Sequence, residues 1–262
     1  MVYIGIDIGS TTTKAVAVDE KRKIKGFSWT KTSFNRIDGA NHVLDNVLLK
    51  SGNKAENIIA IGTTGYGRRM LQKYDGAYPE IVCHGMGTYF LYPKTRTIID
   101  IGGQDSKVIE LMEDGRISKF QMNDKCAAGT GRFFEVLTRT LLDIDLNELG
   151  ELSLKANKPS VISSMCTVFA ESEIVSLMSQ GESRENIIAG MNTAIAKRVY
   201  AMGKSAMIAY NNDVIFTGGV AKNKGVVKIF EELIGSKIVT MEEPQITGAL
   251  GAALMVMKKK DS

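Results

Sequence analysis

A short motif occurs twice in this chain, and it constrains the fold more than any other feature. The first copy spans 7–14 (Asp-Ile-Gly-Ser-Thr-Thr-Thr-Lys) and the second spans 100–107 (Asp-Ile-Gly-Gly-Gln-Asp-Ser-Lys). Aligned without a gap, the Asp, Ile, Gly and Lys positions coincide. Apolar residues flank both copies, which predicts two strands joined by a tight turn. A repeated strand–turn–strand unit predicts two related domains.

The first turn has the residue types that bind a polyphosphate. Gly9 allows the backbone to approach a phosphate closely, and Lys14 adds positive charge if it points inward. Asp7, at the end of the preceding strand, is a candidate catalytic residue because a carboxylate there suits hydrated Mg²⁺. Further hydroxyl and backbone donors come from Ser10, Thr11, Thr12 and Thr13.

The second turn is expected to face the first across a cleft between the domains. Its backbone can approach phosphate at Gly102 and Gly103. Asp100, Gln104 and Asp105 are the other candidate catalytic residues, and Gln104 and Asp105 are placed to orient or activate a water at the terminal phosphate. Gln104 is also a candidate nucleotide contact.

Two more glycine-rich loops follow predicted buried strands. The loop at 62–68 follows a strand expected at 58–61, and it is either a plain turn or a ligand loop at the carboxyl end of the sheet. The loop at 217–223 follows a strand expected at 214–216, and its candidate nucleotide-binding residues are Gly218, Gly219, Val220 and Lys222. Neither a Walker-A loop nor a dinucleotide fingerprint is present.

Together these motifs resemble the nucleotide-binding core of the actin, sugar kinase and Hsp70 superfamily. The resemblance implies an α/β fold of two duplicated actin/Hsp70/ribonuclease-H-like domains with an ATP cleft between them. We expect an N-terminal domain at 1–93 and a C-terminal domain at 94–262, with the last helix at the hinge. In the resemblance, the segments 7–14 and 100–107 are phosphate motifs and 216–223 is the adenosine motif.

Two of the three cysteines have similar surroundings. Cys126 lies among small residues within 122–133, and Cys166 lies within 163–169; a helix is expected after each. The helix after Cys126 is predicted from its apolar residues Phe133, Phe134, Val136, Leu137 and Leu141. The number of cysteines does not suggest a disulfide framework. A lone cysteine is usually a small buried hydrophobe, and we predict this structural role for Cys83.

The cysteine segments, with 65–68 and 100–107, closely resemble the activators of (R)-2-hydroxyacyl-CoA dehydratases, and the resemblance runs nearly end to end. It implies a homodimer with one 4Fe–4S cluster at the subunit interface, held by Cys126 and Cys166 of each chain. Two thiolates per chain and a two-fold axis supply the four ligands. Helix N-termini beyond the cysteines would favour an anionic cluster.

The activity implied by the resemblance is ATP-driven delivery of a low-potential electron to a partner metalloprotein. ATP or ADP and Mg²⁺ are the implied ligands, and ferredoxin or flavodoxin is the implied electron donor. The segment 74–84 lacks the Asp-Lys-Gln stretch found in many of these activators. A double-cubane cluster protein or a benzoyl-CoA-reductase-type partner is therefore the alternative. A small-molecule kinase and a nucleotide-gated scaffold without redox chemistry are more remote readings.

Composition and charge argue against several classes of function. The net charge is +4, and the basic residues are scattered among few aromatic ones, which argues against a nucleic-acid groove. The apolar start at 1–7 reads as a strand and not as a signal peptide, and the chain has no candidate membrane span. We therefore expect a cytoplasmic protein with no membrane partner.

Overall fold

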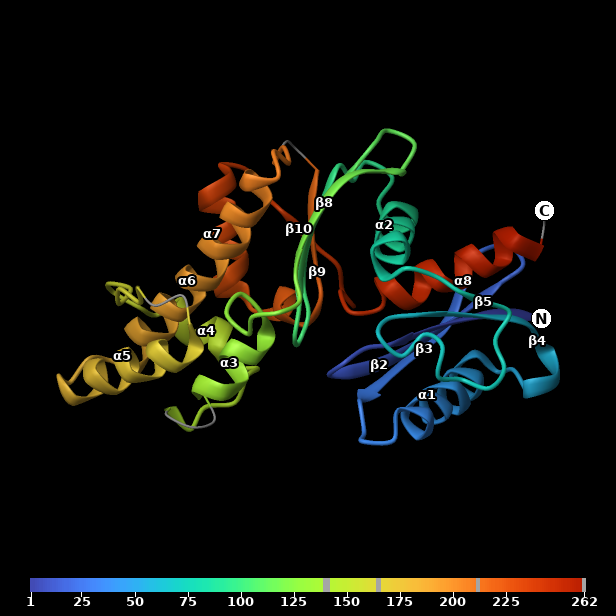
Figure 1. The fold of residues 1–262 in the computed structure, drawn as a ribbon, viewed down its shortest axis with the longest axis horizontal. Helices are drawn as coiled ribbons and strands as arrows, with labels where there is room; N and C mark the ends of the chain where they lie inside the picture. The colour runs from blue at the N-terminus through green and yellow to red at the C-terminus, as the bar shows by residue number, and fades with distance from the viewer. Residues whose placement is uncertain (139–141, 164–165, 211–212, 261–262) are drawn as a thin grey trace. The chain divides into compact units, whose positions relative to one another are not determined.

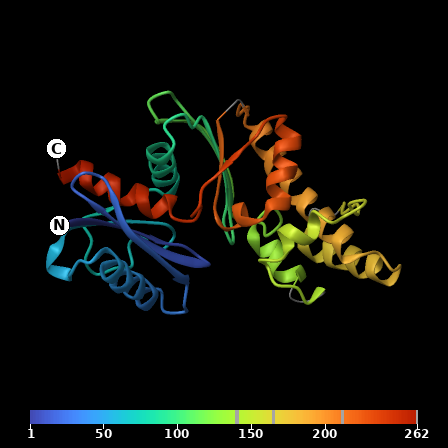
Figure 2. The same cartoon turned by 180° about the vertical axis from the view of Figure 1, so that it is seen from behind.

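The computed structural model describes residues 1–138, 142–163, 166–210 and 213–260. The predicted helix position Leu141 lies outside the described residues. The chain forms two compact units, drawn in Figure 1 and from behind in Figure 2. Unit 1 consists of Met1–Thr95, Leu111–Ile117 and Gln245–Ser262, and unit 2 of Arg96–Glu110 and Ser118–Pro244.

Unit 1 contains a five-stranded sheet with the order β3-β2-β1-β4-β5. β1 pairs antiparallel with β2, as the first motif predicted, and parallel with β4. β2 also pairs antiparallel with β3, and β4 pairs parallel with β5. The strands are β1 (Val2–Ile8), β2 (Thr12–Asp19), β3 (Ile24–Lys31), β4 (Ile58–Thr64) and β5 (Gly76–Ala77).

Two α-helices pack on this sheet, α1 (Arg36–Ser51) and α8 (Thr247–Lys260), and α2 (Glu80–Leu91) packs on α8. A short 3-10 turn, η1 (Ala55–Asn57), precedes β4. Side chains of a strand alternate between its two faces. In β1, Val2 and every second residue to Ile8 join the core beside α1. Gly5 lies against α8, where a Cβ would overlap the Ala249 carbonyl. Figure 1 shows α1 and α8 on opposite faces of the sheet.

Unit 2 repeats the same topology. Its sheet has the order β10-β9-β6-β7-β8. Read from the other edge, this order is β8-β7-β6-β9-β10, so β6 to β10 correspond in turn to β1 to β5. β6 pairs antiparallel with β7 and parallel with β9, which confirms the predicted duplication. The strands are β6 (Thr97–Ile101), β7 (Ser106–Leu111), β8 (Ile117–Asn123), β9 (Val214–Thr217) and β10 (Val239–Thr240).

The helices of unit 2 form one large core with its sheet, in which Phe133, Met191, Phe216 and Phe230 are buried. The helices predicted after Cys126 and after Cys166 are present as α3 (Gly131–Leu137) and α5 (Thr167–Ser179). Unit 2 also contains α4 (Leu149–Ser153), α6 (Arg184–Ser205), α7 (Lys224–Ile234) and the 3-10 turn η3 (Gly219–Lys222). Within the described part of the chain, no helix is long and apolar enough to cross a membrane.

Candidate functional site

The first hairpin turn places Asp7 and Lys14 opposite each other in the β1–β2 register. Lys14 Nζ donates to Asp7 Oδ2 at 2.9 Å, and the Asp7 side chain is only 2% exposed. Asp7 Oδ1 is buried and has no hydrogen-bond partner among the described residues. A buried carboxylate oxygen without a donor is costly unless a cation or water reaches it. This oxygen therefore fits the predicted role of Asp7 toward hydrated Mg²⁺.

The other residues of the first turn differ in how accessible they are to a ligand. Gly9 N donates to Thr12 O at 3.2 Å and closes the turn. Ser10, Thr11 and Thr12 are half-buried. Thr13 is fully buried and its hydroxyl lies 3.0 Å from that of Thr32, so this side chain holds the turn and is not open to a ligand.

The second hairpin turn has the same backbone geometry but more internal charge pairing. Lys107 Nζ lies 3.2 Å from Asp100 Oδ2 and 2.9 Å from Asp105 Oδ2, and its side chain is 1% exposed. The Thr217 hydroxyl donates to Asp100 Oδ1 at 2.7 Å. Gln104 is exposed. Of the two residues expected to handle water, Gln104 is accessible, whereas Asp105 is buried in an ion pair.

The second turn is also tied to the segment that follows Cys126. Gly131 N donates to Gly102 O at 2.8 Å, and Arg132 N donates to Gly103 O at 2.7 Å. The first N–H groups of α3 are thus used by the turn. The second turn and the start of α3 are therefore joined by two backbone hydrogen bonds.

The loops after β4 and β9 form a further matched pair. Gly65 and Gly218 have φ angles of 84° and 86°, which side chains rarely adopt. A Cβ on Gly65 would lie 2.5 Å from Asp7 Oδ1, and one on Gly218 would overlap the Ile101 carbonyl. Sequence reasoning left the role of the loop at 62–68 open. The signal it missed is the Thr-Gly pair that ends both β4 and β9.

The predicted adenosine loop is well ordered by contacts within unit 2. Gly218 N donates to Pro244 O at 2.9 Å, and η3 begins at Gly219. Val220 is 8% exposed and packs on the core, and Lys222 lies 3.2 Å from Glu243. The backbone of this loop is therefore held in place, and its glycines form the part that can approach a ligand closely.

The three thiols differ in accessibility. Cys83 is buried in α2, and burial raises the pKa of its thiol to about 12. Cys126 is half-buried in a loop held by Asn123, whose Nδ2 donates to Cys126 O at 2.9 Å and to Ala128 O at 3.1 Å. Cys166 is exposed and is the N-cap of α5.

The surroundings of Cys166 suit an anionic ligand at a surface that another molecule covers. The first turn of α5 begins directly after the thiol, with its N–H groups at the positive end of the helix dipole. Val168 and Phe169, in that turn, are 65% and 67% exposed. Apolar side chains exposed beside a thiol are typical of an interaction site.

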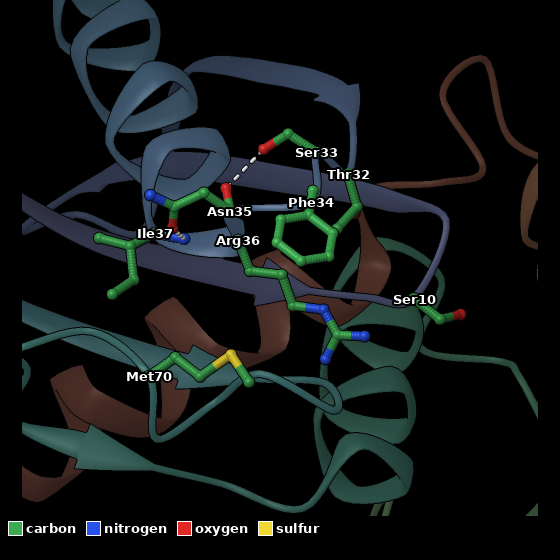
Figure 3. A pocket seen from close by; sticks show the side chains of 8 residues that line it. All are labelled: Ser10, Thr32, Ser33, Phe34, Asn35, Arg36, Ile37 and Met70. Atoms are coloured by element: carbon green, nitrogen blue, oxygen red, sulfur yellow. Dashed lines mark hydrogen bonds between the residues drawn. The ribbon is translucent and has the colours of Figure 1, made fainter.

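A cavity of about 620 Å³ lies beside the first turn in unit 1. Figure 3 shows the Arg36 side chain extending in the direction of Ser10, with the Phe34 ring and Met70 along the same cavity. Sequence reasoning did not find it, because the β3–α1 connection carries no recognisable motif. The Arg36 guanidinium lines the same cavity as Ser10, so it adds positive charge near the first turn.

The fold and the paired turns define an ATPase of the actin-like class, and comparison with known proteins agrees. Residues 4–256 match the BadF/BadG/BcrA/BcrD ATPase family, and the chain belongs to this family. The fold class predicted from sequence is confirmed.

Relatives with assigned roles are similar over nearly the whole chain. An activator of lactoyl-CoA dehydratase from Anaerotignum propionicum is 46% identical, covering 97% of this chain and 96% of the relative. A 2-hydroxyisocaproyl-CoA dehydratase activator from Clostridioides difficile is 44% identical, covering 97% and 94%. The solved structure of the activator of the 2-hydroxyisocaproyl-CoA dehydratase from Clostridium difficile, with bound ADPNP, superposes with a TM-score of 0.93. It is 41% identical, covering 100% of this chain and 96% of that one.

Proposed function

We propose that this protein is an ATPase that works as a homodimer and delivers a low-potential electron to a partner metalloprotein, a 2-hydroxyacyl-CoA dehydratase. The observation that carries the proposal is the combination in unit 2 of two accessible thiols and a phosphate turn. The strong similarity to dehydratase activators supports this class of partner over a double-cubane protein or a benzoyl-CoA-reductase-type partner.

Cys126 and Cys166 fit the ligation of a 4Fe–4S cluster shared between two chains. Both thiols are accessible, whereas Cys83 is not. In the described residues, no group of three or more His, Cys, Asp or Glu side chains is arranged to hold a metal ion. A 4Fe–4S cluster is usually held by four thiolates, and two copies of the chain would supply them from Cys126 and Cys166. A bound cluster would supply the one-electron chemistry, and ferredoxin or flavodoxin would supply the electron.

The nucleotide would bind through both turns. Gly9 and the hydroxyls of 10–12 would receive phosphate in unit 1, and Asp7 Oδ1 would accept from a water of Mg²⁺. Gly102 and Gly103 would receive phosphate in unit 2, the glycines at 218–219 would lie against the nucleoside, and Gln104 would orient the attacking water.

The hydrogen bonds between Gly102–Gly103 and the start of α3 give a physical route from nucleotide to thiol. A shift of the second turn on ATP binding or hydrolysis would move α3 and the loop that carries Cys126. ATP acts on such a system only through its different affinity for two conformations. We infer that hydrolysis makes the electron delivery unidirectional by this means.

The proposal is tested by reducing the protein with dithionite and measuring whether it activates purified 2-hydroxyisocaproyl-CoA dehydratase when ATP is added. The same measurement is made with cysteine variants. We expect Cys126→Ala and Cys166→Ala to lose iron and abolish activation while retaining ATP binding. The control Cys83→Ala keeps about four irons per dimer and full activation, because Cys83 is buried in α2. Full iron content in either of the first two variants would contradict the proposal.

A further inference from the structure

A second cavity, of about 640 Å³, lies in unit 2 behind the Cys126 loop. Its size is within the range of about 300–1,000 Å³ that is usual for small-molecule sites. Phe133, Ile195 and Val199 form apolar parts of its lining, and Ser106, Asn123 and Arg198 form polar parts. The cavity therefore combines an apolar body with a few convergent polar groups.

Ser106 separates this cavity from the phosphate turn. Neighbouring side chains of β7 point to opposite faces of the sheet, and Lys107 is paired with Asp100 and Asp105. Ser106 therefore faces away from these carboxylates. Ser106 is 1% exposed, and its Oγ has no hydrogen-bond partner among the described residues. A buried hydroxyl of this kind, at the wall of a cavity, points to a ligand that hydrogen-bonds it.

Arg198 supplies positive charge to the same cavity. Gly129 has a φ of 87°, and a Cβ there would lie 3.0 Å from Arg198 Cδ and 3.4 Å from Arg198 Nε. The glycine thus makes room for the arginine under the cysteine loop. Arg198 is half-buried, and a guanidinium in such a position binds carboxylates well through its planar array of donors.

Asn123 connects the cavity to Cys126. Asn123 lines the cavity, and its side chain bonds both the N–H and the carbonyl of Cys126, with Cys126 N donating to Asn123 Oδ1 at 3.3 Å. A molecule in the cavity would therefore touch the residue that shapes the cysteine loop.

We propose that this cavity binds a small organic carboxylate with an apolar body. The carboxylate is received by Arg198 and the Ser106 hydroxyl, and the apolar body packs on Ile195, Val199 and Phe133. This site lies on the other face of β7 from the Lys107 ion pairs, and the proposal does not depend on the electron-transfer function.

Equilibrium dialysis of radiolabelled hexanoate against the full-length protein as purified tests the proposal. We expect saturable binding at one site per chain. Acetate lacks the apolar body and hexan-1-ol lacks the carboxylate, so each competes at least about tenfold less well than unlabelled hexanoate. Saturating ATP is expected to leave hexanoate bound, because the two sites are separate.

Variants of the cavity residues test where hexanoate binds. Arg198→Gln and Ser106→Ala are each expected to weaken hexanoate binding about tenfold, and Lys204→Gln, an exposed residue of the same helix, changes it less than about twofold. The urea midpoint of Ser106→Ala is expected to be no lower than that of the parent, because the lost hydroxyl has no partner among the described residues. The proposal is overturned if hexanoate does not bind saturably, or if it binds equally to the parent and both cavity variants. Either result would leave the cluster and ATP experiments unaffected.

Discussion

The two units have the same strand order and the same hairpin motif, but the charged side chains of the motif are paired differently. Each has the same strand order, an Asp–Lys pair across its first hairpin, and a glycine with positive φ after its fourth strand. In unit 1, Asp7 keeps one oxygen without a hydrogen-bond partner among the described residues. In unit 2, Lys107 bridges two carboxylates and Thr217 donates to Asp100.

This difference indicates that the two copies of the motif have separate tasks. A carboxylate with an unpartnered oxygen suits a metal or water ligand, whereas carboxylates held by a buried lysine suit a rigid support for the backbone of the turn. We therefore expect Asp7 to act on the nucleotide's metal ion, and Asp100 and Asp105 to hold the turn that connects to α3. Variants of matched positions in the two units can break or sharpen this contrast.

The largest expected effect comes from removing the lysines. Lys107→Met leaves two buried carboxylates without their cation and is expected to lower the free energy of unfolding by about 3–5 kcal/mol. Lys14→Met is expected to cost about half as much, because Lys14 is 14% exposed and pairs with Asp7. Urea denaturation followed by circular dichroism measures both. If both variants lose the same free energy of unfolding, the proposed difference between the two turns is contradicted.

A smaller effect is expected at the threonines that end β4 and β9. Thr217→Val removes the donor to the Asp100 carboxylate and is expected to cost about 1.5–3 kcal/mol, as for hydrogen bonds to charged groups. Thr64→Val removes a bond of 3.0 Å to the neutral Tyr78 carbonyl and is expected to cost about 0.5–1.5 kcal/mol. The same denaturation experiment applies, and a larger loss for Thr64→Val would contradict the assignment of the supporting role to unit 2.

The sequence was sufficient to predict the features that are local. The repeated turns are contiguous segments with recognisable residue types, so the duplication and the strands around Asp7 and Asp100 could be predicted. Cys166 was correctly placed directly before a helix, because the apolar pattern begins immediately after it.

Features that depend on contacts between distant segments could not be predicted in the same way. Asp105 was expected near water, but the turn geometry directs it to Lys107. The equivalence of Gly65 and Gly218 follows from strand register, which the sequence does not state. The cavity beside Ser106 is formed by β7, β8 and α6, and no single segment carries its pattern.

The central claim is that Cys126 and Cys166 of two chains share one cluster. Native mass spectrometry of anaerobically purified protein tests it most directly. We predict a species with the mass of two chains plus four irons and four sulfides, and separation into iron-free single chains when either cysteine is replaced by alanine. A single chain that retains a complete cluster, or a dimer that remains iron-free after anaerobic reconstitution, would contradict the account.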